Sequence, residues 1–349
     1  MNGFTVGIAG AGLLGRLLAW QLARDGHRVT VFDPASGPEP AFDGHGAAAL
    51  SAAGMLSPLA EMENGGADVA SLGWRSIARW REIIGQLSER PFFAERGSLL
   101  LAHRGDLGTA QRMLGRLGGS QPLAAEQLAE MEPAIHGPAH AWLLPGEAQI
   151  DPVGTMAALH ADAFGATWRW RCRVLGLQAG AVRLDDGAEH RFDWVFDVRG
   201  VGARPEMPVR GVRGETVWLH APDHGLRRPV RLLHPRHRVY IVPRPGERLI
   251  VGASEVESED RSPASLRSVV ELLAAAHSVM PALAEARVLR LDTNLRPALP
   301  DNLPRIEVSA GRVRINGLFR HGWLMAPALV DDALVECGLR VAKPLEAAA

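Results

Sequence analysis

The sequence predicts an α/β fold in which a Rossmann-like parallel sheet is interleaved with an α+β part built on a largely antiparallel sheet. Residues 4–33 read as a strand, a glycine turn, a helix and a second strand, which is how a doubly wound parallel sheet begins. Residues 214–252 alternate short apolar runs with proline, glycine and charged turns, as antiparallel sheets do. A glycine turn that leads into a helix returns at 316–327, near the C-terminus. These observations imply that each part is assembled from separate pieces of the chain.

The opening unit contains the glycine turn Gly10-Ala11-Gly12-Leu13-Leu14-Gly15. In such a turn Gly10 permits the tight bend, Gly12 lets a pyrophosphate approach the backbone, and Gly15 lets the helix pack closely on the strand. The following helix points its free N–H groups and positive dipole end at the phosphates. Asp33 ends the second strand, where it can accept hydrogen bonds from an adenosine ribose. The unit predicts dinucleotide binding, without distinguishing FAD from NAD; an ordinary βαβ unit with packing glycines is the alternative.

The remaining elements follow from periodicity and from helix or turn signals. Asp151 and Pro152 suit the N-cap and first position of a helix, and Ser262 is the expected cap of a later one. Helices are expected at 69–87, 106–117, 124–131, 152–164, 263–280 and 328–337. Strands are expected at 92–101, 139–144, 193–198, 214–219, 230–233, 239–242, 249–252, 288–291 and 313–315, and a hairpin-like pair at 168–177 and 181–184.

Composition limits the function classes. A chain of 349 residues is long enough for two domains, and 47% hydrophobic with 22% charged residues is typical of a soluble globular protein. A net charge of −1 gives no general attraction to nucleic acid or to an anionic membrane. Cys172 and Cys337 form no CxxC pair, and from the apolar pattern we expect neither a signal peptide nor a membrane-spanning segment. We therefore expect a cytoplasmic protein with no nucleic-acid partner, no membrane contact and no metal site.

Four further segments could carry chemistry. Residues 44–58 are so rich in Gly and Ala that either another helix or a flat ligand is expected against their backbone. Tyr240-Ile241-Val242-Pro243-Arg244 holds the only tyrosine, Asn294-Leu295-Arg296-Pro297 holds an arginine in a stiff segment, and 316–327 is a glycine-punctuated loop entering a helix. A buried carboxylate ligand needs a charged, bidentate partner, which the planar fork of Arg296 provides. An interdomain ion pair for Arg296 and a plain sheet aromatic for Tyr240 are the alternatives.

Taken together, these segments resemble the glycine oxidases of the thiamine pathway, within the flavin-dependent D-amino-acid oxidase (DAO) family. The resemblance rests on GAGLLG with Asp33, SAAGML at 51–56, YIVPR followed by LIVGAS, NLRPALPDNLP and NGLFRHGWLMAP, in the family's order. It implies an FAD-binding domain made of residues 1–85, 150–210 and 300–349. It also implies a substrate-binding domain made of 86–149 and 211–299.

The resemblance also implies roles for individual residues. Arg296 and Tyr240 would bind the substrate carboxylate, and Arg320 would stand beside the reacting ring as the third catalytic candidate. The residues implied to contact a non-covalent FAD are Gly10, Gly12, Leu14, Gly15, Asp33, Ala53, Gly54, Met55, Val174, Gly200, Arg320, His321, Gly322, Trp323 and Leu324. Among these, Val174 would meet the adenine through its backbone, and Ala53, Gly54 and Met55 would lie beside the isoalloxazine.

The implied reaction is hydride transfer from Cα of glycine or another small amino acid to flavin N5, followed by reoxidation by O₂. It would yield an imine or 2-oxo acid, ammonia and H₂O₂, and thiazole synthase would be the partner in thiamine synthesis. The alternatives are a sarcosine-type oxidase, a quinone-linked D-amino-acid dehydrogenase, the flavin half of a tRNA-modifying enzyme, and a flavin module without turnover. The preferred amine, the electron acceptor and the oligomeric state, including a homo-oligomer, stay open.

Three further features are not part of the family pattern. Many relatives have a small-residue turn where this chain has Asp197-Val198-Arg199-Gly200, so Asp197 or Arg199 is expected to replace backbone contacts to FAD. The segment 227–238 holds five arginines and two histidines, His234 and His237, which have no neighbouring carboxylate or cysteine and so predict no metal. Neither cysteine lies in a matching segment, which argues against covalent attachment of the flavin.

Overall fold

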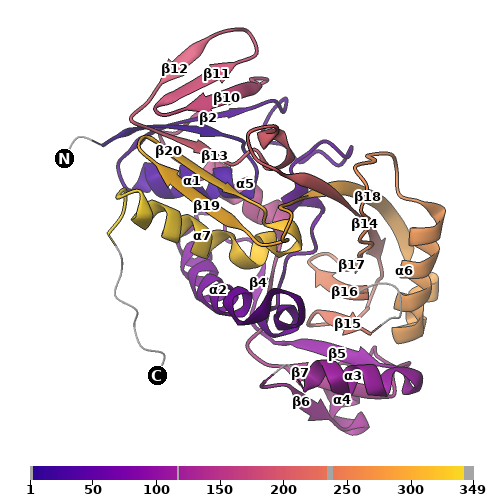
Figure 1. Cartoon of the computed structure of the whole chain (residues 1–349). Helices are drawn as coiled ribbons and strands as arrows, with labels where there is room; N and C mark the ends of the chain where they lie inside the picture. Colours follow the sequence, from indigo (N-terminus) through magenta and orange to yellow (C-terminus); the bar gives the residue numbers. More distant parts are fainter. Residues whose placement is uncertain (1–2, 116–117, 234–238, 342–349) are drawn as a thin grey trace.

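The computed structural model describes residues 3–115, 118–233 and 239–341. Two large sheets dominate it, with the six-stranded sheet and its helices on one side of the molecule and the eight-stranded sheet on the other (Figure 1). The predicted α/β class, with a parallel sheet and a second, largely antiparallel one, is confirmed.

The six-stranded sheet contains the opening unit. Its strand order is β19 (Arg305–Ser309), β20 (Arg312–Asn316), β13 (Trp194–Asp197), β1 (Thr5–Ala9), β2 (Arg28–Asp33) and β9 (Thr167–Trp170). Neighbouring strands pair in parallel except at the edge, where β19 is antiparallel to β20. Because the carboxyl ends of the parallel strands share one edge, the turns after β1 and β13 lie side by side.

Both faces of this sheet are covered. Val6 and Ile8 face the helices α1 (Leu13–Arg24), α5 (Pro152–Ala161), α2 (Pro58–Gln86) and α7 (Gly322–Glu336), of which α1 and α7 pack together and α2 packs on α7. On the other face Ala9 and Phe32 pack on a three-stranded sheet of β10 (Val174–Gln178), β11 (Ala181–Leu184) and β12 (Glu189–Arg191) (Figure 1). Successive side chains of β1 and β2 point to opposite faces of the sheet, so these strands contribute to two separate hydrophobic cores.

The eight-stranded sheet is antiparallel except where β15 meets β5. Its order is β18 (Arg287–Ala298), β14 (Arg210–His220), β17 (Arg248–Gly252), β16 (Val239–Arg244), β15 (Val230–Leu232), β5 (Ser98–Ala102), β7 (His140–Leu144) and β6 (Gln121–Leu123). Helix α6 (Leu266–Val279) packs on one face, and α3 (Leu107–Leu114) and α4 (Ala125–Met131) lie near β5 to β7 (Figure 1). A further small sheet has the order β3 (Met55–Leu56), β8 (Ala148–Ile150) and β4 (Phe93–Ala94). The predicted domain boundaries stay a prediction.

Several expected boundaries were wrong, each for a local reason. The last helix begins at Gly322 rather than near Ala328, and Pro327 lies inside it. A residue at 327 would normally donate to the carbonyl of Trp323, but Trp80 Nε1 donates to that oxygen instead, at 2.8 Å. The cap of α6 is Ser265, which accepts from the Ser268 backbone, whereas Ser262 donates to Asp260.

The stretch from 168 to 177 and the segment around Arg296 also differ from expectation. The predicted single strand is divided between β9 and β10, because Arg171 adopts a φ of 59° between them. The strand expected at 288–291 continues to Ala298, so Arg296 lies in β18, which pairs with β14 along its length, and Pro297 faces Gly211 in that register. The proline removes one N–H donor near the end of this edge strand without interrupting it.

Candidate active site

One cavity of about 1060 Å³ extends from the opening glycine turn to the inner face of the eight-stranded sheet. Of the residues that the sequence predicted for the site, Gly15 does not line it. Those that do line it are Gly10, Gly12, Leu14, Asp33, Ala53, Gly54, Met55, Val174, Gly200, Tyr240, Arg296, Arg320, His321, Gly322, Trp323 and Leu324. The fold therefore brings five separated segments to one space, while the roles predicted for their residues stay predictions.

The glycine turn has the shape that a phosphate group needs. Gly10 takes a φ of 106°, and a Cβ on Gly15 would overlap the Gly10 carbonyl oxygen, so both positions require glycine. A Cβ on Gly12 would meet only the Ala47 side chain, at 3.9 Å, so this glycine opens onto the cavity. Gly12 also begins α1 without a side-chain cap, which leaves the first N–H groups of the helix available to an anion.

Asp33 is held at the rim of this turn. Its Oδ2 accepts from the Ala11 backbone at 2.6 Å and its Oδ1 from the Ala35 backbone at 2.8 Å. The two bonds orient the carboxylate and leave further lone pairs toward the cavity. Residues 171–175 run beside it, because Cys172 N donates to the Asp33 carbonyl at 3.0 Å.

Arg16, which the sequence analysis did not single out, fixes the same turn from behind. Its guanidinium donates to the carbonyls of Ala11, Met156 and Pro38 at 2.8 to 3.0 Å. Burial lowers the pKa of Arg16 to about 10, so the group stays charged at neutral pH. The sequence did contain a signal for this role, namely an arginine within the apolar run LLGRLL. A charged side chain in a buried helix needs hydrogen-bond partners nearby.

The small-residue segment lies along the middle of the cavity. Gly54 adopts a φ of 69°, its carbonyl accepts from Ile150 N at 2.8 Å, and a Cβ would overlap the Ile150 oxygen. Ala49 O accepts from Trp323 Nε1 at 3.0 Å, which joins this segment to the start of α7. The backbone at 53–55 is thus fixed against a strand and exposes little side-chain bulk to the cavity.

The inner face of the eight-stranded sheet forms the other end of the cavity. Register places Arg231, Tyr240, Gly252 and Thr216 in one row across four adjacent strands. A Cβ on Gly252 would lie 2.7 Å from the Tyr240 hydroxyl oxygen, and a Cβ on Gly214 would overlap the Arg296 guanidinium. The two glycines therefore make the room that these larger side chains occupy.

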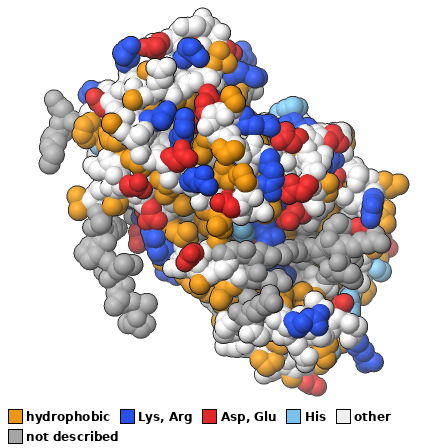
Figure 2. All heavy atoms as spheres, viewed as in Figure 1, with side chains coloured by type: hydrophobic (Ala, Val, Ile, Leu, Met, Phe, Trp, Pro, Cys, Tyr) orange, Lys and Arg blue, Asp and Glu red, His pale blue; other side chains and the backbone are white. Residues whose placement is uncertain are grey.

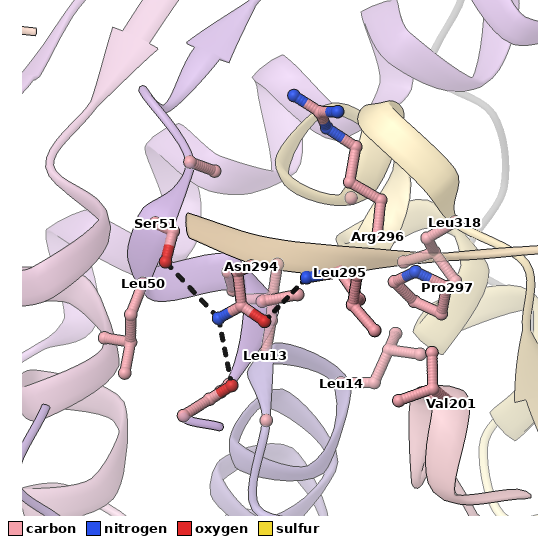
Figure 3. Close-up of a pocket in the computed structure, with 18 of the residues that line it drawn as sticks. Leu13, Leu14, Leu50, Ser51, Val201, Asn294, Leu295, Arg296, Pro297 and Leu318 are labelled. Carbon is pink, nitrogen blue, oxygen red and sulfur yellow. Dashed lines mark hydrogen bonds between the residues drawn. The ribbon is translucent and has the colours of Figure 1, made fainter. Parts of the chain in front are cut away.

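Arg296 is a cationic group available to an anion at this end of the cavity. Its Nη1 donates to the carbonyls of Ser254 at 3.1 Å and Arg213 at 3.3 Å, and no ion pair joins it to a carboxylate among the described residues. Figure 3 shows its guanidinium on the opposite side of β18 from Leu13 and Leu14, while Asn294 anchors the strand through Ser51. Burial lowers the pKa of Arg296, and an entering carboxylate would offset that cost.

Tyr240 supplies a neutral donor beside it. Burial raises the pKa of Tyr240, so the phenol stays protonated across the physiological range. A protonated hydroxyl can donate to a carboxylate without adding charge.

Arg320 differs from Arg296, because two carboxylates balance its charge. Its Nη2 donates to Glu61 Oε2 at 2.9 Å and its Nη1 to Glu255 Oε2 at 3.4 Å. Glu61 also pairs with Arg231 at 3.2 Å and with His321 at 3.3 Å. Arg231 and Arg320 thus pair with carboxylates, whereas Arg296 has no such ion pair among the described residues. The Glu61 network was not predicted from the sequence.

The second glycine turn, at 200–203 after β13, also borders the cavity. Gly200 has a φ of 58° and lines it, as do Val174 and Arg199. Asp197 is buried instead and forms an ion pair with Arg199 at 2.7 Å.

Other candidate chemistry is not assembled in the described part of the chain. Residues 3–115, 118–233 and 239–341 bring together no group of three or more His, Cys, Asp or Glu that could hold a metal, and His234 and His237 lie outside them. Cys172 and Cys337 are free thiols that do not line the cavity. Within the same ranges, no helix has both the length and the apolar character to cross a membrane. On the face in Figure 2, basic and acidic side chains are interspersed.

Comparisons with known proteins show the family of the chain. The family model described as FAD dependent oxidoreductase (DAO) matches residues 5–331. The thiamine biosynthesis oxidoreductase ThiO of Rhizobium etli is 39% identical over 329 residues, covering 93% of this chain and 94% of that protein. The bifunctional ThiO/ThiG protein of Nostoc is 28% identical over 94% of this chain, which spans 52% of the fused protein. The glycine oxidase structure from Geobacillus kaustophilus superposes with a TM-score of 0.81 at 25% identity, covering 96% of this chain and 95% of that one.

Proposed function

This chain belongs to the DAO family of FAD-dependent oxidoreductases, and from that premise we propose that it oxidises glycine or another small amino acid in thiamine biosynthesis. The observation that carries the proposal is Arg296, a cavity guanidinium with carbonyl contacts and no carboxylate partner among the described residues. The names of its relatives, ThiO and glycine oxidase, support the same assignment.

The residues of the cavity fit FAD. The open Gly12, the uncapped start of α1 and the oriented Asp33 suit a pyrophosphate and a ribose, and the bare backbone at Gly54 suits a flat ring. We propose that FAD is held without a covalent bond, which the position of both cysteines outside the cavity supports. When bound, FAD would accept hydride from the substrate Cα at N5 and pass the electrons to O₂, so that an imine or 2-oxo acid, ammonia and H₂O₂ result.

The chain's own residues bind and orient the substrate. Arg296 receives the carboxylate with its planar fork, and Tyr240 adds a neutral hydrogen bond to the same group. With its carboxylate fixed, the substrate has little freedom left, which is how positioning contributes to the rate. Arg320 pairs with Glu61 and Glu255 in the neighbouring wall of the cavity, so it does not bind the substrate carboxylate.

A partner follows from the fused relative. Because the Nostoc protein is named ThiO/ThiG, we propose that the imine made here is passed to thiazole synthase. Both reactions would take place in the cytoplasm. An imine hydrolyses in water, so a short transfer path would protect the product.

Anaerobic mixing with a substrate panel tests the proposal. The FAD-loaded protein is mixed with glycine, sarcosine, D-alanine and D-proline without O₂, and the flavin absorbance near 450 nm is followed. Bleaching by glycine, followed by H₂O₂ formation when air is admitted, is the expected result. Bleaching by other amines alone would reassign the substrate, and no bleaching by any of them would contradict an amine oxidase.

A further inference from the structure

The turn after β13 contains a side chain that the proposed function leaves without a role. Arg199 stands where small residues are typical of the family, and its side chain is 9% exposed at the wall of the cavity. An arginine this buried costs free energy unless each of its donors has a partner. The position of those partners therefore indicates what the residue does.

Asp197 holds the guanidinium in one orientation. Arg199 Nε donates to Asp197 Oδ1 at 2.9 Å and Nη2 donates to Oδ2 at 2.7 Å, a bidentate pair. Asp197 is itself 1% exposed at the end of β13, and Glu206 lies 3.5 Å from Nη2. Because two parallel hydrogen bonds fix both the position and the plane of the group, the remaining nitrogen points in a defined direction.

That remaining nitrogen reaches another sheet. Arg199 Nη1 donates to the carbonyl oxygen of Val174 at 3.0 Å. Val174 is the first residue of β10, in the three-stranded sheet that covers the back of the parallel one. Arg199 thus joins the carboxyl edge of the parallel sheet to the start of β10 across the rim of the cavity.

The joined segment lies beside the expected ribose site. Cys172 N donates to the Asp33 carbonyl at 3.0 Å, and Val174 and Leu175 line the cavity two and three residues later. If Asp33 holds the adenosine ribose, an adenine base extends along this segment. The backbone of Val174 then forms the edge against which the base would hydrogen-bond.

We propose that Arg199 is a positioning residue for the adenine end of FAD, acting through the backbone of Val174. This inference rests on the proposed placement of the FAD adenosine at Asp33. Arg199 uses one nitrogen to fix the Val174 carbonyl and the other two to hold itself on Asp197. A lysine cannot do both, because it lacks the planar fork.

Flavin affinity separates this role from a general structural one. Apoprotein is titrated with FAD and with FMN, which lacks the adenosine, and the quenching or enhancement of flavin fluorescence gives Kd for each. In Arg199→Met and Arg199→Lys, the Kd for FAD should rise roughly 10-fold to 100-fold, the effect of one charge-assisted hydrogen bond. The Kd for FMN should stay within about twofold of the wild-type value. Arg191→Met, an exposed arginine of β12, is the matched control and should change neither Kd.

Each other outcome overturns the inference. An unchanged ratio of FAD to FMN affinity in the Arg199 variants would remove the residue from adenine binding, and an equal loss of both would indicate a structural role alone. If Arg199→Met does not fold, Arg199→Lys carries the test, since it retains the charge beside Asp197. Wild-type protein that binds FAD no more tightly than FMN would refute the adenosine placement. Bleaching by glycine in FAD-saturated wild type tests the proposed function independently.

Discussion

The guanidinium of Arg296 lies against the backbone of Gly214, at a position that the side chain of any other residue at 214 would occupy. The two residues are on paired strands, with Arg296 opposite Val212 and Gly214 opposite Asn294, so the arginine reaches diagonally across the sheet. The sheet therefore sets where a bound carboxylate would lie, because Gly214 has no side chain to displace the guanidinium.

Gly214→Ala should weaken substrate binding while leaving the flavin in place. The new methyl group displaces the Arg296 guanidinium, and a loss of about 1.4 to 2.8 kcal/mol in transition-state binding corresponds to roughly 10-fold to 100-fold in kcat/KM. Steady-state kinetics and the flavin spectrum measure the two effects. Gly85→Ala in α2, where a Cβ would meet nothing within 4 Å, is the control and should retain full activity. Normal kinetics in Gly214→Ala would show that Arg296 has room to shift without loss.

Gly12→Val should yield folded, colourless protein. A Cβ at Gly12 points into the cavity and meets only Ala47 at 3.9 Å, so the larger side chain fills space expected for the pyrophosphate without disturbing the core. Circular dichroism measures folding, and absorbance of the purified protein measures bound flavin. A normal flavin spectrum would place the cofactor elsewhere.

Glu61→Ala should destabilise the fold much more than Glu255→Ala. Glu61 is 8% exposed and pairs with Arg231 and Arg320, so its removal leaves two largely buried guanidinium groups without this carboxylate, at a cost of about 3–5 kcal/mol. Glu255 is half exposed and makes one pair at 3.4 Å, which contributes about 0–1 kcal/mol. Denaturant unfolding of both variants gives the comparison. Equal losses would mean that the Glu61 network contributes no more than a surface pair.

Glu147→Gln should change how stability depends on pH. Burial raises the pKa of Glu147, and its carboxyl accepts from Ala60 N and Ser98 Oγ. The folded state therefore binds this proton more tightly than the unfolded state, whose pKa is about 4.3. The contribution of Glu147 to the free energy of unfolding is therefore fully present below the unfolded-state pKa. It is lost as the pH rises through the folded-state pKa. The difference in free energy of unfolding, wild type minus Glu147→Gln, should fall as the pH rises above about 4. A constant difference would contradict a raised pKa.

What could be predicted from the sequence was the chemistry of contiguous segments. The opening turn depends on Gly10, Gly12 and Asp33, which are close in the chain, so their spacing carries the information. The α/β class followed from the change of hydrophobic period along the chain. Only the resemblance to a family grouped the site segments together. Nothing in the spacing of Tyr240 and Arg296 along the chain predicts that both line one cavity.

The features that were missed depend on long-range register and on absent side chains. Gly214 and Gly252 matter because the Arg296 guanidinium and the Tyr240 ring occupy the space where their side chains would be. A glycine in a strand does not reveal which residue packs over it from a neighbouring strand. One partner of Arg320 is Glu61, 259 residues away, and only the packed fold brings them together. The start of α7 was misplaced because Pro327 looked like a boundary, whereas Trp80 satisfies the carbonyl that the proline leaves free.

The most direct test compares Arg296→Met with wild type in anaerobic flavin reduction by glycine. Loss of two charge-assisted hydrogen bonds, at about 1.5–3 kcal/mol each, predicts a fall of roughly 10²–10⁴ in kcat/KM with an unchanged flavin spectrum. Arg287→Met, an exposed arginine on the same strand, should reduce its flavin at the wild-type rate. Flavin reduction in Arg296→Met as fast as in wild type would contradict the assignment of Arg296 as the carboxylate receptor.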